Sequence, residues 1–255
     1  MSDKTVGPSS AQRLPSELYR EIAANLHDPS NRPALLSLSL VNTTWRTESQ
    51  RVLFRSLCDK YKSDDKWWRE KKRLRDTHVG FLRAIVAHPT RLGSFVRSYA
   101  QIGLVSNIIN DPSERGDTGN CELWELTLRA LPMFTNLKQL AFVPQIGSMT
   151  FEAAVALSRC TFQLVYLSWG CEFGRQLEQF LLTSGSLIEH LDMGSALGDL
   201  RPLPPSAAAV KYLSMDRYSP PSNLFKPGST GTIDVVYRDD AGIIRPNEPP
   251  NACPP

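Results

Sequence analysis

Apolar residues recur every four positions near the N-terminus of the chain. Leu14, Leu18, Ile22 and Leu26 have this spacing, which places them on one side of a single helix. Pro15 stands where a proline is tolerated at a helix start, because the first N–H groups of a helix have no partner within it. The pattern predicts a helix that begins near Pro15 and carries one apolar stripe.

A second apolar set follows the polar turn at residues 27–33. Asn42 lies within it and offers a helix cap, which predicts a break between two further helices. The members of the set are Leu35, Leu36, Leu38, Leu40, Val41, Trp45, Val52, Leu53 and Leu57. A unit of about 45 residues buries only a modest fraction of its surface. We therefore expect part of this apolar surface to meet another domain or another protein.

Two motifs in this region carry a resemblance. Leu-Pro-x-Glu-Leu at residues 14–18, and Leu-Val-Asn-x-x-Trp-Arg at residues 40–46, resemble the F-box of fungal, basidiomycete-type F-box proteins over about a fifth of the chain. The resemblance implies a three-helix module that docks on a Skp-type adaptor and so joins a cullin–RING ubiquitin ligase. The residues that would form or support this docking surface are Leu14, Pro15, Leu18, Ile22, Leu36, Leu40 and Trp45. The alternative is an ordinary helical hairpin that caps a larger domain.

A repeat occupies much of the remaining chain. Four segments share the spacing apolar-x-x-apolar-x-apolar, and their central leucines are Leu140, Leu167, Leu191 and Leu213. The spacing between successive leucines is therefore 27, 24 and 22 residues. A weak earlier copy covers residues 96–99, and a fifth copy is predicted at residues 233–236, centred 23 residues after Leu213. Helical patterns fill the spacers at residues 123–131, 151–157 and 177–182.

A short strand with a returning helix in each period resembles the leucine-rich repeat. Such repeats cannot cover their own apolar faces, so neighbours stack. The family's Asn or Cys position would fall at Gln145, Glu172, Ala196 and Tyr218, which makes the repeats irregular. The expected fold class is α/β: an N-terminal three-helix F-box, then an irregular leucine-rich-repeat-like solenoid with a short-stranded parallel sheet. The alternative is a doubly wound α/β domain, although no Gly-rich phosphate loop follows any strand.

Strand alternation predicts which residues face away from the core. The expected columns are Gln139, Tyr166, His190, Tyr212 and Val235, and beside them Ala141, Ser168, Asp192, Ser214 and Tyr237. Tyrosines beside a His and an Asp are suited to an interaction surface. Our candidates for binding a target protein are Tyr166, His190, Asp192 and Tyr212; the alternative is a merely solvated face.

These patterns divide the chain into five parts. We expect a disordered tail at 1–11, the F-box at 12–57, a charged helical connector at 58–92, the repeat domain at 93–238 and a Pro-rich tail at 239–255. Trp67 and Trp68 interrupt the charged run in the connector. Acidic residues are interleaved with the basic ones there, which favours a solvated segment over a nucleic-acid site.

Composition narrows the possible functions. The net charge of +3 is too small to indicate nucleic acid or anionic lipid as a partner. No apolar run is long enough to span a bilayer, and the first residues lack the apolar segment of a secretory signal. The five cysteines are scattered and do not neighbour the four histidines in sequence, which argues against a zinc site and favours reduced thiols in a cytoplasmic or nuclear protein.

No constellation of residues predicts catalysis, and we expect no cofactor and no metal. The expected function is therefore that of a non-catalytic adaptor. Its F-box would bind a Skp-type adaptor, and through it a cullin, while the repeat surface captures a target protein for ubiquitin transfer. The first alternative is a scaffolding repeat protein whose F-box-like module acts outside a ligase. The second is an enzyme with an unrecognised pocket, which would need a cleft with clustered titratable groups.

Overall fold

The computed structural model describes residues 14–57, 67–102, 118–143, 147–169, 175–184, 187–192, 210–216, 234–238 and 244–246. The chain divides into two compact units, which we call the N-terminal unit (residues 1–54) and the sheet unit (residues 55–255). Each unit is considered by itself.

The described residues of the N-terminal unit form three α-helices and one short 3-10 helix. The α-helices are α1 (Ser16–Asn25), α2 (Arg32–Leu38) and α3 (Thr43–Leu53), and the 3-10 helix η1 (Pro29–Asn31) precedes α2. Pro15 caps α1 through its carbonyl, which accepts the N–H of Leu18 at 3.1 Å. Asn42 caps α3 through its side-chain oxygen, which accepts the N–H of Trp45 at 2.9 Å. The start of α1 near Pro15 and the cap at Asn42 both fall where the sequence predicts them.

Helix α3 is the centre of the N-terminal unit, because both α1 and α2 pack against it. Glu48 of α3 is buried and lies 3.7 Å from the Arg20 guanidinium of α1 and 3.6 Å from that of Arg51. The turn before α2 is fixed by Asp28, whose carboxylate accepts hydrogen bonds from the hydroxyl and the N–H of Ser30 at 2.6 and 2.8 Å. These bonds, the hydroxyl first, hold the pKa of Asp28 below its ordinary value.

The sheet unit contains one eight-stranded sheet whose spatial order equals the order along the chain. Neighbouring strands are parallel from β1 to β7, and β8 pairs with β7 antiparallel. The strands are β1 (Ser56–Leu57), β2 (Ser98–Ile102), β3 (Gln139–Val143), β4 (Tyr166–Trp169), β5 (His190–Asp192), β6 (Tyr212–Asp216), β7 (Asp234–Arg238) and β8 (Ile244–Pro246). This order has no reversal, whereas a doubly wound sheet has a switch point at which the strand order reverses.

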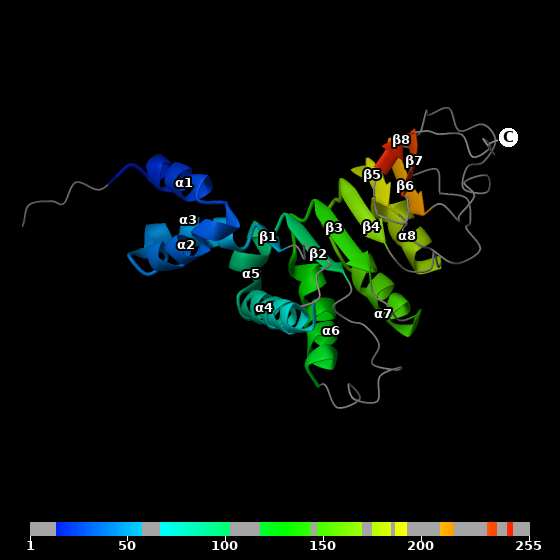
Figure 1. The fold of residues 1–255 in the computed structure, drawn as a ribbon, viewed down its shortest axis with the longest axis horizontal. Helices are drawn as coiled ribbons and strands as arrows, with labels where there is room; N and C mark the ends of the chain where they lie inside the picture. Colours follow the sequence, from blue (N-terminus) through cyan, green and yellow to red (C-terminus); the bar gives the residue numbers. More distant parts are fainter. Residues whose placement is uncertain are drawn as a thin grey trace, which may run out of the picture. The chain divides into compact units, whose positions relative to one another are not determined.

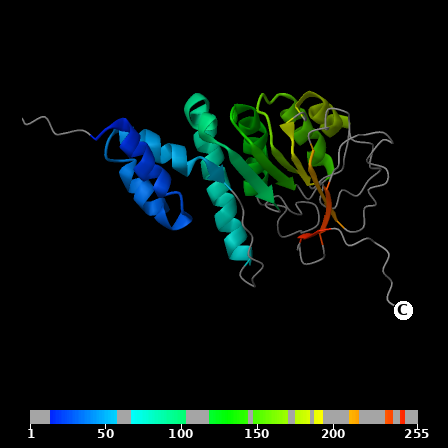
Figure 2. The same cartoon turned by 90° about the horizontal axis from the view of Figure 1, so that it is seen from above.

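Helices follow the strands on one face of this sheet, as Figure 1 shows for α4, α6, α7 and α8. Helix α4 packs on α6, α6 on α7 and α7 on α8. Figure 2 shows the strands side by side from a second direction. The helices are α4 (Trp67–Ala87), α5 (Pro89–Leu92), η2 (Gly93–Phe95), α6 (Thr118–Ala130), η3 (Leu131–Met133), α7 (Gly147–Ser158) and α8 (Arg175–Ser184). The helices predicted in the three spacers are confirmed as α6, α7 and α8.

Three rows of buried side chains cross the strands and form the core of the sheet unit. The first row is Val96, Leu137, Leu164, Ile188 and Val210; the second is Tyr99, Leu140, Leu167, Leu191 and Leu213; the third is Gln101, Phe142 and Trp169. The rings of Trp124, Phe142 and Trp169 follow one another at 5.6 and 5.8 Å. Each such aliphatic or aromatic side chain contributes roughly 1.5–3 kcal/mol when it is fully buried, so the rows stabilise the sheet continuously from strand to strand.

The predicted register of the fifth copy is wrong by one residue. Val235 pairs with Leu213 in the core row, so the partner of Tyr212 is Asp234, and the partner of Ser214 is Val236. A shift of one residue moves every side chain of a strand to the opposite face. The sequence 233–236 has apolar residues at three of its four positions, and such a run does not determine which of them faces the core.

Three predicted boundaries also differ from the structure. Ser56–Leu57 was expected to end the N-terminal module, but it pairs with Ser98–Tyr99 as the first strand of the sheet. The expected connector supplies α4, whose Phe81, Leu82 and Ile85 are buried in the sheet unit. In the expected Pro-rich tail, Ile244–Pro246 forms the edge strand β8, a place where the missing N–H of a proline is tolerated.

Candidate protein-interaction surfaces

The N-terminal unit exposes large apolar side chains on two of its helices. From α1 and the residues before it these are Leu14, Leu18 and Ile22, and from α2 and the turn after it Leu36, Leu40 and Val41, with exposed fractions from 39% for Leu18 to 80% for Leu40. We call these six residues the apolar surface. Five of them are predicted docking residues, and Pro15 beside them is exposed as well.

The remaining predicted docking residue, Trp45, lies differently. Trp45 is half-buried, and its ring meets that of Tyr19 edge-on at a centroid distance of 4.8 Å. This contact joins α3 to α1, so Trp45 supports the arrangement of the helices. Val41 is the surface residue that the sequence interpretation missed. Its position directly after Leu40, in the turn before the Asn42 cap, was the available signal, since a turn residue of a small unit has little core to enter.

The exposed face of the sheet carries a stack of three rings. Tyr166, His190 and Tyr212 occupy one register position on β4, β5 and β6. The rings of His190 and Tyr212 are nearly parallel, with centroids 4.5 Å apart, and those of Tyr166 and His190 lie 6.4 Å apart. Tyr212 is 44% exposed. The structure therefore brings three of the four predicted target-binding residues together, and we call them the ring stack.

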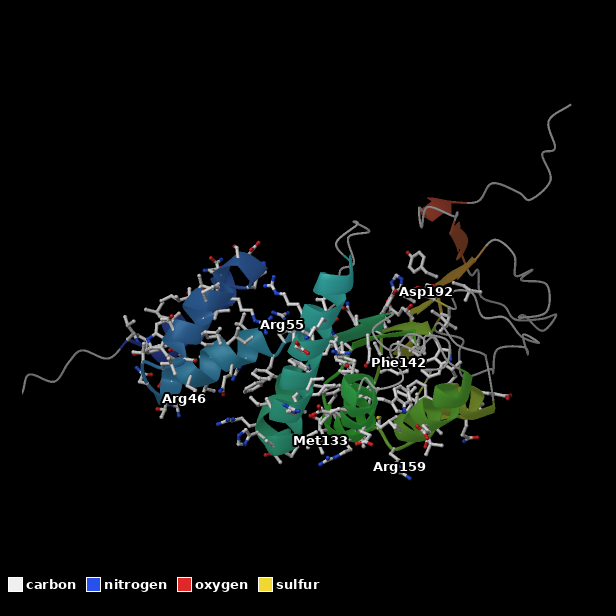
Figure 3. The ribbon with its side chains drawn as sticks, turned by 60° about the horizontal axis from the view of Figure 1, so that its bottom comes forward. Arg46, Arg55, Met133, Phe142, Arg159 and Asp192 are labelled. Atoms are coloured by element: carbon white, nitrogen blue, oxygen red, sulfur yellow. The ribbon has the colours of Figure 1, made fainter. Side chains whose placement is uncertain are left out.

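Asp192, the fourth predicted target-binding residue, is not on the surface. It is 2% exposed, and its carboxylate accepts a hydrogen bond from the Ser168 hydroxyl on the neighbouring strand at 2.9 Å (Figure 3). Strand alternation places both side chains on the face opposite the central leucines, as expected. Alternation does not show whether that face is covered at a given column, and at this column Ser168 and Asp192 are both buried.

A buried polar network inside the sheet unit was not predicted from the sequence. The Tyr99 hydroxyl donates to the side-chain oxygen of Gln101 at 2.9 Å, and His78 lies 3.4 Å from the Tyr99 oxygen. The Thr127 hydroxyl lies 2.9 Å from the same Gln101 oxygen and 2.7 Å from the Leu123 carbonyl oxygen. Gln101 takes the place in the third core row that Phe142 and Trp169 take on the next strands. The Tyr99 donor satisfies the buried amide oxygen, and these contacts bring α4, β2 and α6 together, which is a structural role.

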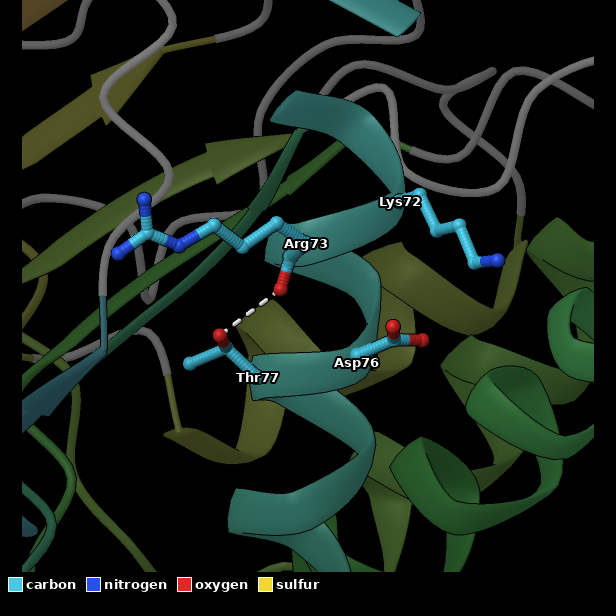
Figure 4. A pocket seen from close by; sticks show the side chains of 4 residues that line it. All are labelled: Lys72, Arg73, Asp76 and Thr77. Atoms are coloured by element: carbon cyan, nitrogen blue, oxygen red, sulfur yellow. Dashed lines mark hydrogen bonds between the residues drawn. The ribbon is translucent and has the colours of Figure 1, made fainter. Parts of the chain in front are cut away.

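Three observations on the described residues bear on catalysis and metal binding. An open hollow on α4 is lined by Lys72, Arg73, Asp76 and Thr77, and the Thr77 hydroxyl is directed to the Arg73 carbonyl of its own helix at 2.8 Å (Figure 4). Within the described ranges there is no cluster of three or more His, Cys, Asp or Glu side chains that could hold a metal ion. Burial raises the pKa of the Cys160 thiol to about 12, so this sulfur is a protonated, weak nucleophile at neutral pH.

Some predicted features lie outside the described residues. These include the four positions at which the leucine-rich repeat has its Asn or Cys, as well as Ser214 and Tyr237 as side chains. Among the helices that the structure describes, none has the length and apolar character needed to cross a bilayer.

Comparison with known proteins adds no relative: no family model matches the chain, and no curated protein matches its sequence. The functional assignment therefore depends on the residues and their geometry. The structure defines a mixed α/β protein with a helical N-terminal unit and a parallel sheet followed by one antiparallel edge strand.

Proposed function

We propose that the protein is a non-catalytic, target-recognition adaptor of a cullin–RING ubiquitin ligase. Its N-terminal unit docks on a Skp-type adaptor in the manner of an F-box, and the exposed face of its leucine-rich-repeat-like sheet unit binds the target protein. The observation that carries the proposal is the apolar surface, which includes residues of both F-box-like motifs: Leu14 and Leu18 of the first, and Leu40 and Val41 of the second.

The exposure of the apolar surface supports docking on a protein partner. Leu36, Leu40 and Val41 are each more than half exposed, within a unit of three short helices. Burying the exposed part of such a side chain contributes roughly 1 kcal/mol. Six of them together supply an apolar centre of the kind found in stable interfaces. A partner that presents an apolar helical groove would cover this surface.

The sheet unit supports the second half of the proposal. Its helices lie on one face, and the opposite face carries the ring stack, in which Tyr212 is 44% exposed. Tyr and His side chains in a row across adjacent strands give a rigid, amphipathic contact area, and tyrosine is enriched among the residues that dominate protein interfaces.

The test is co-purification with a Skp-type adaptor. The double variant Leu36→Ala/Leu40→Ala removes two exposed side chains of the apolar surface. We expect it to lose about 2 kcal/mol or more of binding free energy, which is roughly a thirtyfold weaker complex. Leu182→Ala is the matched control, because Leu182 is an exposed leucine of the sheet unit and its removal should leave adaptor binding unchanged.

Two results would overturn the proposal. The first is a folded Leu36→Ala/Leu40→Ala variant that binds the adaptor as tightly as the original protein. The second is a complex that contains the adaptor and consistently excludes the cullin, which would favour a scaffold that acts outside a ligase. Circular dichroism of each variant establishes that it is folded.

A further inference from the structure

The residues that directly precede strands β1 to β6 form a regular edge of the sheet. At this edge the carbonyl of one residue accepts two successive N–H groups from the next strand. The Arg55 carbonyl accepts the N–H groups of Arg97 and Ser98 at 2.8 and 3.1 Å, and the Arg97 carbonyl accepts those of Lys138 and Gln139 at 2.9 and 3.0 Å. Arg55, Arg97 and Lys138 are therefore register neighbours at the starting edge of β1, β2 and β3.

The same edge continues through β4, β5 and β6 with Val165, Glu189 and Lys211. Its one acidic residue is already neutralised, because the Glu189 carboxylate lies 3.0 Å from the Lys211 ammonium. The three cations at the other end have no such partner. Arg55, Arg97 and Lys138 are exposed, and within the described part of the chain no carboxylate pairs with any of them. We call these three residues the basic edge.

Three cations in neighbouring register positions repel one another. Adjacent strands lie about 4.8 Å apart, so the backbones of Arg55 and Lys138 are separated by roughly 10 Å. Like charges opposite one another on neighbouring strands are destabilising. Arg97 donates one guanidinium N–H to the Asn136 carbonyl at 3.2 Å, which leaves the other N–H groups of the guanidinium available. An anionic partner with several charges would relieve this repulsion and fill the open donors.

We infer that the basic edge binds an acidic polypeptide segment, rich in Asp or Glu, of the target protein. The inference rests on the proposed function, since it describes the chemistry of the target that the sheet unit recognises. Lys138 directly precedes β3, and β3 lies next to β4, which carries Tyr166 of the ring stack. A segment lying across the sheet therefore reaches both features, with its acidic residues at the basic edge.

The size of the basic edge favours a polypeptide over a nucleic acid. Nucleic-acid sites commonly neutralise about 6–10 phosphates, and the edge supplies three cations. The ring stack next to it has an imidazole between two phenols, and the neighbouring cation Lys211 is paired with Glu189. An extended acidic segment needs only a few charge-assisted hydrogen bonds to be held in register.

The experiment uses the full chain and a short fluorescent peptide of alternating Glu and Ser residues. Peptide binding is measured by fluorescence anisotropy for the original protein and for the triple variant Arg55→Gln/Arg97→Gln/Lys138→Gln, and the two affinities are compared. Arg159→Gln is the matched control, since Arg159 is an exposed cation at the end of α7, away from Arg55 in the sheet unit (Figure 3). A peptide with Gln in place of each Glu measures binding that does not depend on charge.

The inference predicts that the triple variant binds the Glu peptide at least tenfold more weakly than the original protein, whereas Arg159→Gln stays within twofold. The affinity of the original protein should also fall as the ionic strength is raised from about 0.05 to about 0.2 M. Equal binding by the triple variant, or equal binding of the Glu and Gln peptides, overturns the inference. So does a single-stranded oligonucleotide that outcompetes the peptide for the original protein and fails to bind the triple variant.

The failure of this inference and that of the proposed function are distinguishable. The basic edge lies in the sheet unit, and the triple variant retains the whole apolar surface, so it should bind a Skp-type adaptor as the original protein does. Loss of peptide binding with adaptor binding intact supports both ideas. A protein that binds the peptide through the basic edge but never binds the adaptor retains the acidic-segment site and loses the ligase role.

Discussion

Leucines have opposite environments in the two units of this protein. In the sheet unit, Leu140, Leu167 and Leu191 are at most 1% exposed, whereas Leu36 and Leu40 of the N-terminal unit are 52% and 80% exposed. The residue type is the same and the helices and strands are equally regular. The difference arises because the sheet has a layer of helices over its apolar face, while α1 and α2 pack mainly against α3.

The comparison shows which unit is complete by itself. Among the described residues, the large aromatic side chains that are fully buried, Trp169, Tyr99, Phe134, Phe142, Phe162 and Phe180, all belong to the sheet unit. In the N-terminal unit the apolar residues that are buried are Ala23 and Leu35. The sheet unit thus holds a core of large side chains, whereas the N-terminal unit leaves the apolar surface exposed.

The largest expected effect comes from opening the core of the sheet unit. Trp169→Ala removes a fully buried ring that lies against Phe142 at 5.8 Å, and such substitutions cost about 3–5 kcal/mol. We expect faster hydrogen exchange, measured by mass spectrometry, throughout β3–β5 and unchanged exchange in α1–α3. Tyr166→Ala on the exposed face of the same strand is the control and should have a much smaller effect. Equal acceleration of exchange in both units would contradict the expectation that the loss of stability stays within the sheet unit.

An intermediate effect is expected at a close backbone approach in the sheet unit. A Cβ at Gly93 would collide with the carbonyl oxygen of Met133, whereas a Cβ at Gly80 in α4 would meet nothing within 4 Å. Gly93→Ala should therefore cost about 1–3 kcal/mol, because the backbone has to shift. Gly80→Ala should stabilise the protein by roughly 0.5–1 kcal/mol, because alanine favours the helix. Urea unfolding of both variants measures the two changes in the free energy of unfolding. Changes of the same sign would contradict the difference in space that the structure shows at Gly93 and Gly80.

The smallest expected effect belongs to the N-terminal unit. Leu40→Ala should change the free energy of unfolding by less than about 0.5 kcal/mol, as is usual for exposed positions. Its effect should appear only when a Skp-type adaptor is added, because a ligand of the folded state raises the free energy of unfolding by an amount that grows with the logarithm of its concentration relative to its dissociation constant. Thermal unfolding with and without adaptor separates the two contributions. A large loss of stability in the isolated Leu40→Ala variant would mean that Leu40 belongs to an internal core.

The local elements of the fold could be predicted from the sequence because their signals are local. The spacing of Leu14, Leu18 and Ile22 indicated α1, Asn42 indicated the start of α3, and the recurring leucines indicated the strands and their order of pairing. The fifth strand of the repeat was misplaced by one residue, because Val235 and Val236 are both apolar and alternation alone does not choose between them. The basic edge could have been found by aligning the repeats, since Arg97 and Lys138 occupy the same place after the first apolar residue of their copies.

Of the four target-binding candidates, the three rings could be placed from the sequence and Asp192 could not, again because only local signals are readable from the sequence. Tyr166, His190 and Tyr212 follow from alternation, a property of the strand itself, and the structure places them in one stack. The burial of Asp192 depends on what lies over its column, and the half-burial of Trp45 depends on Tyr19 in another helix. Both contacts join residues far apart in the chain, so no spacing in the sequence reports them.

The sequence by itself determined where most of the helices and the repeated strands form, because side-chain periods of 3.6 and 2 residues are set by the backbone of each element. It also determined that the repeats must stack, because no single repeat covers its own apolar face. Only the tertiary structure decided which leucines stay exposed, where the N-terminal unit ends, and that Arg55, Arg97 and Lys138 share one edge. Those outcomes depend on coverage and register between distant segments, which are properties of the packed chain.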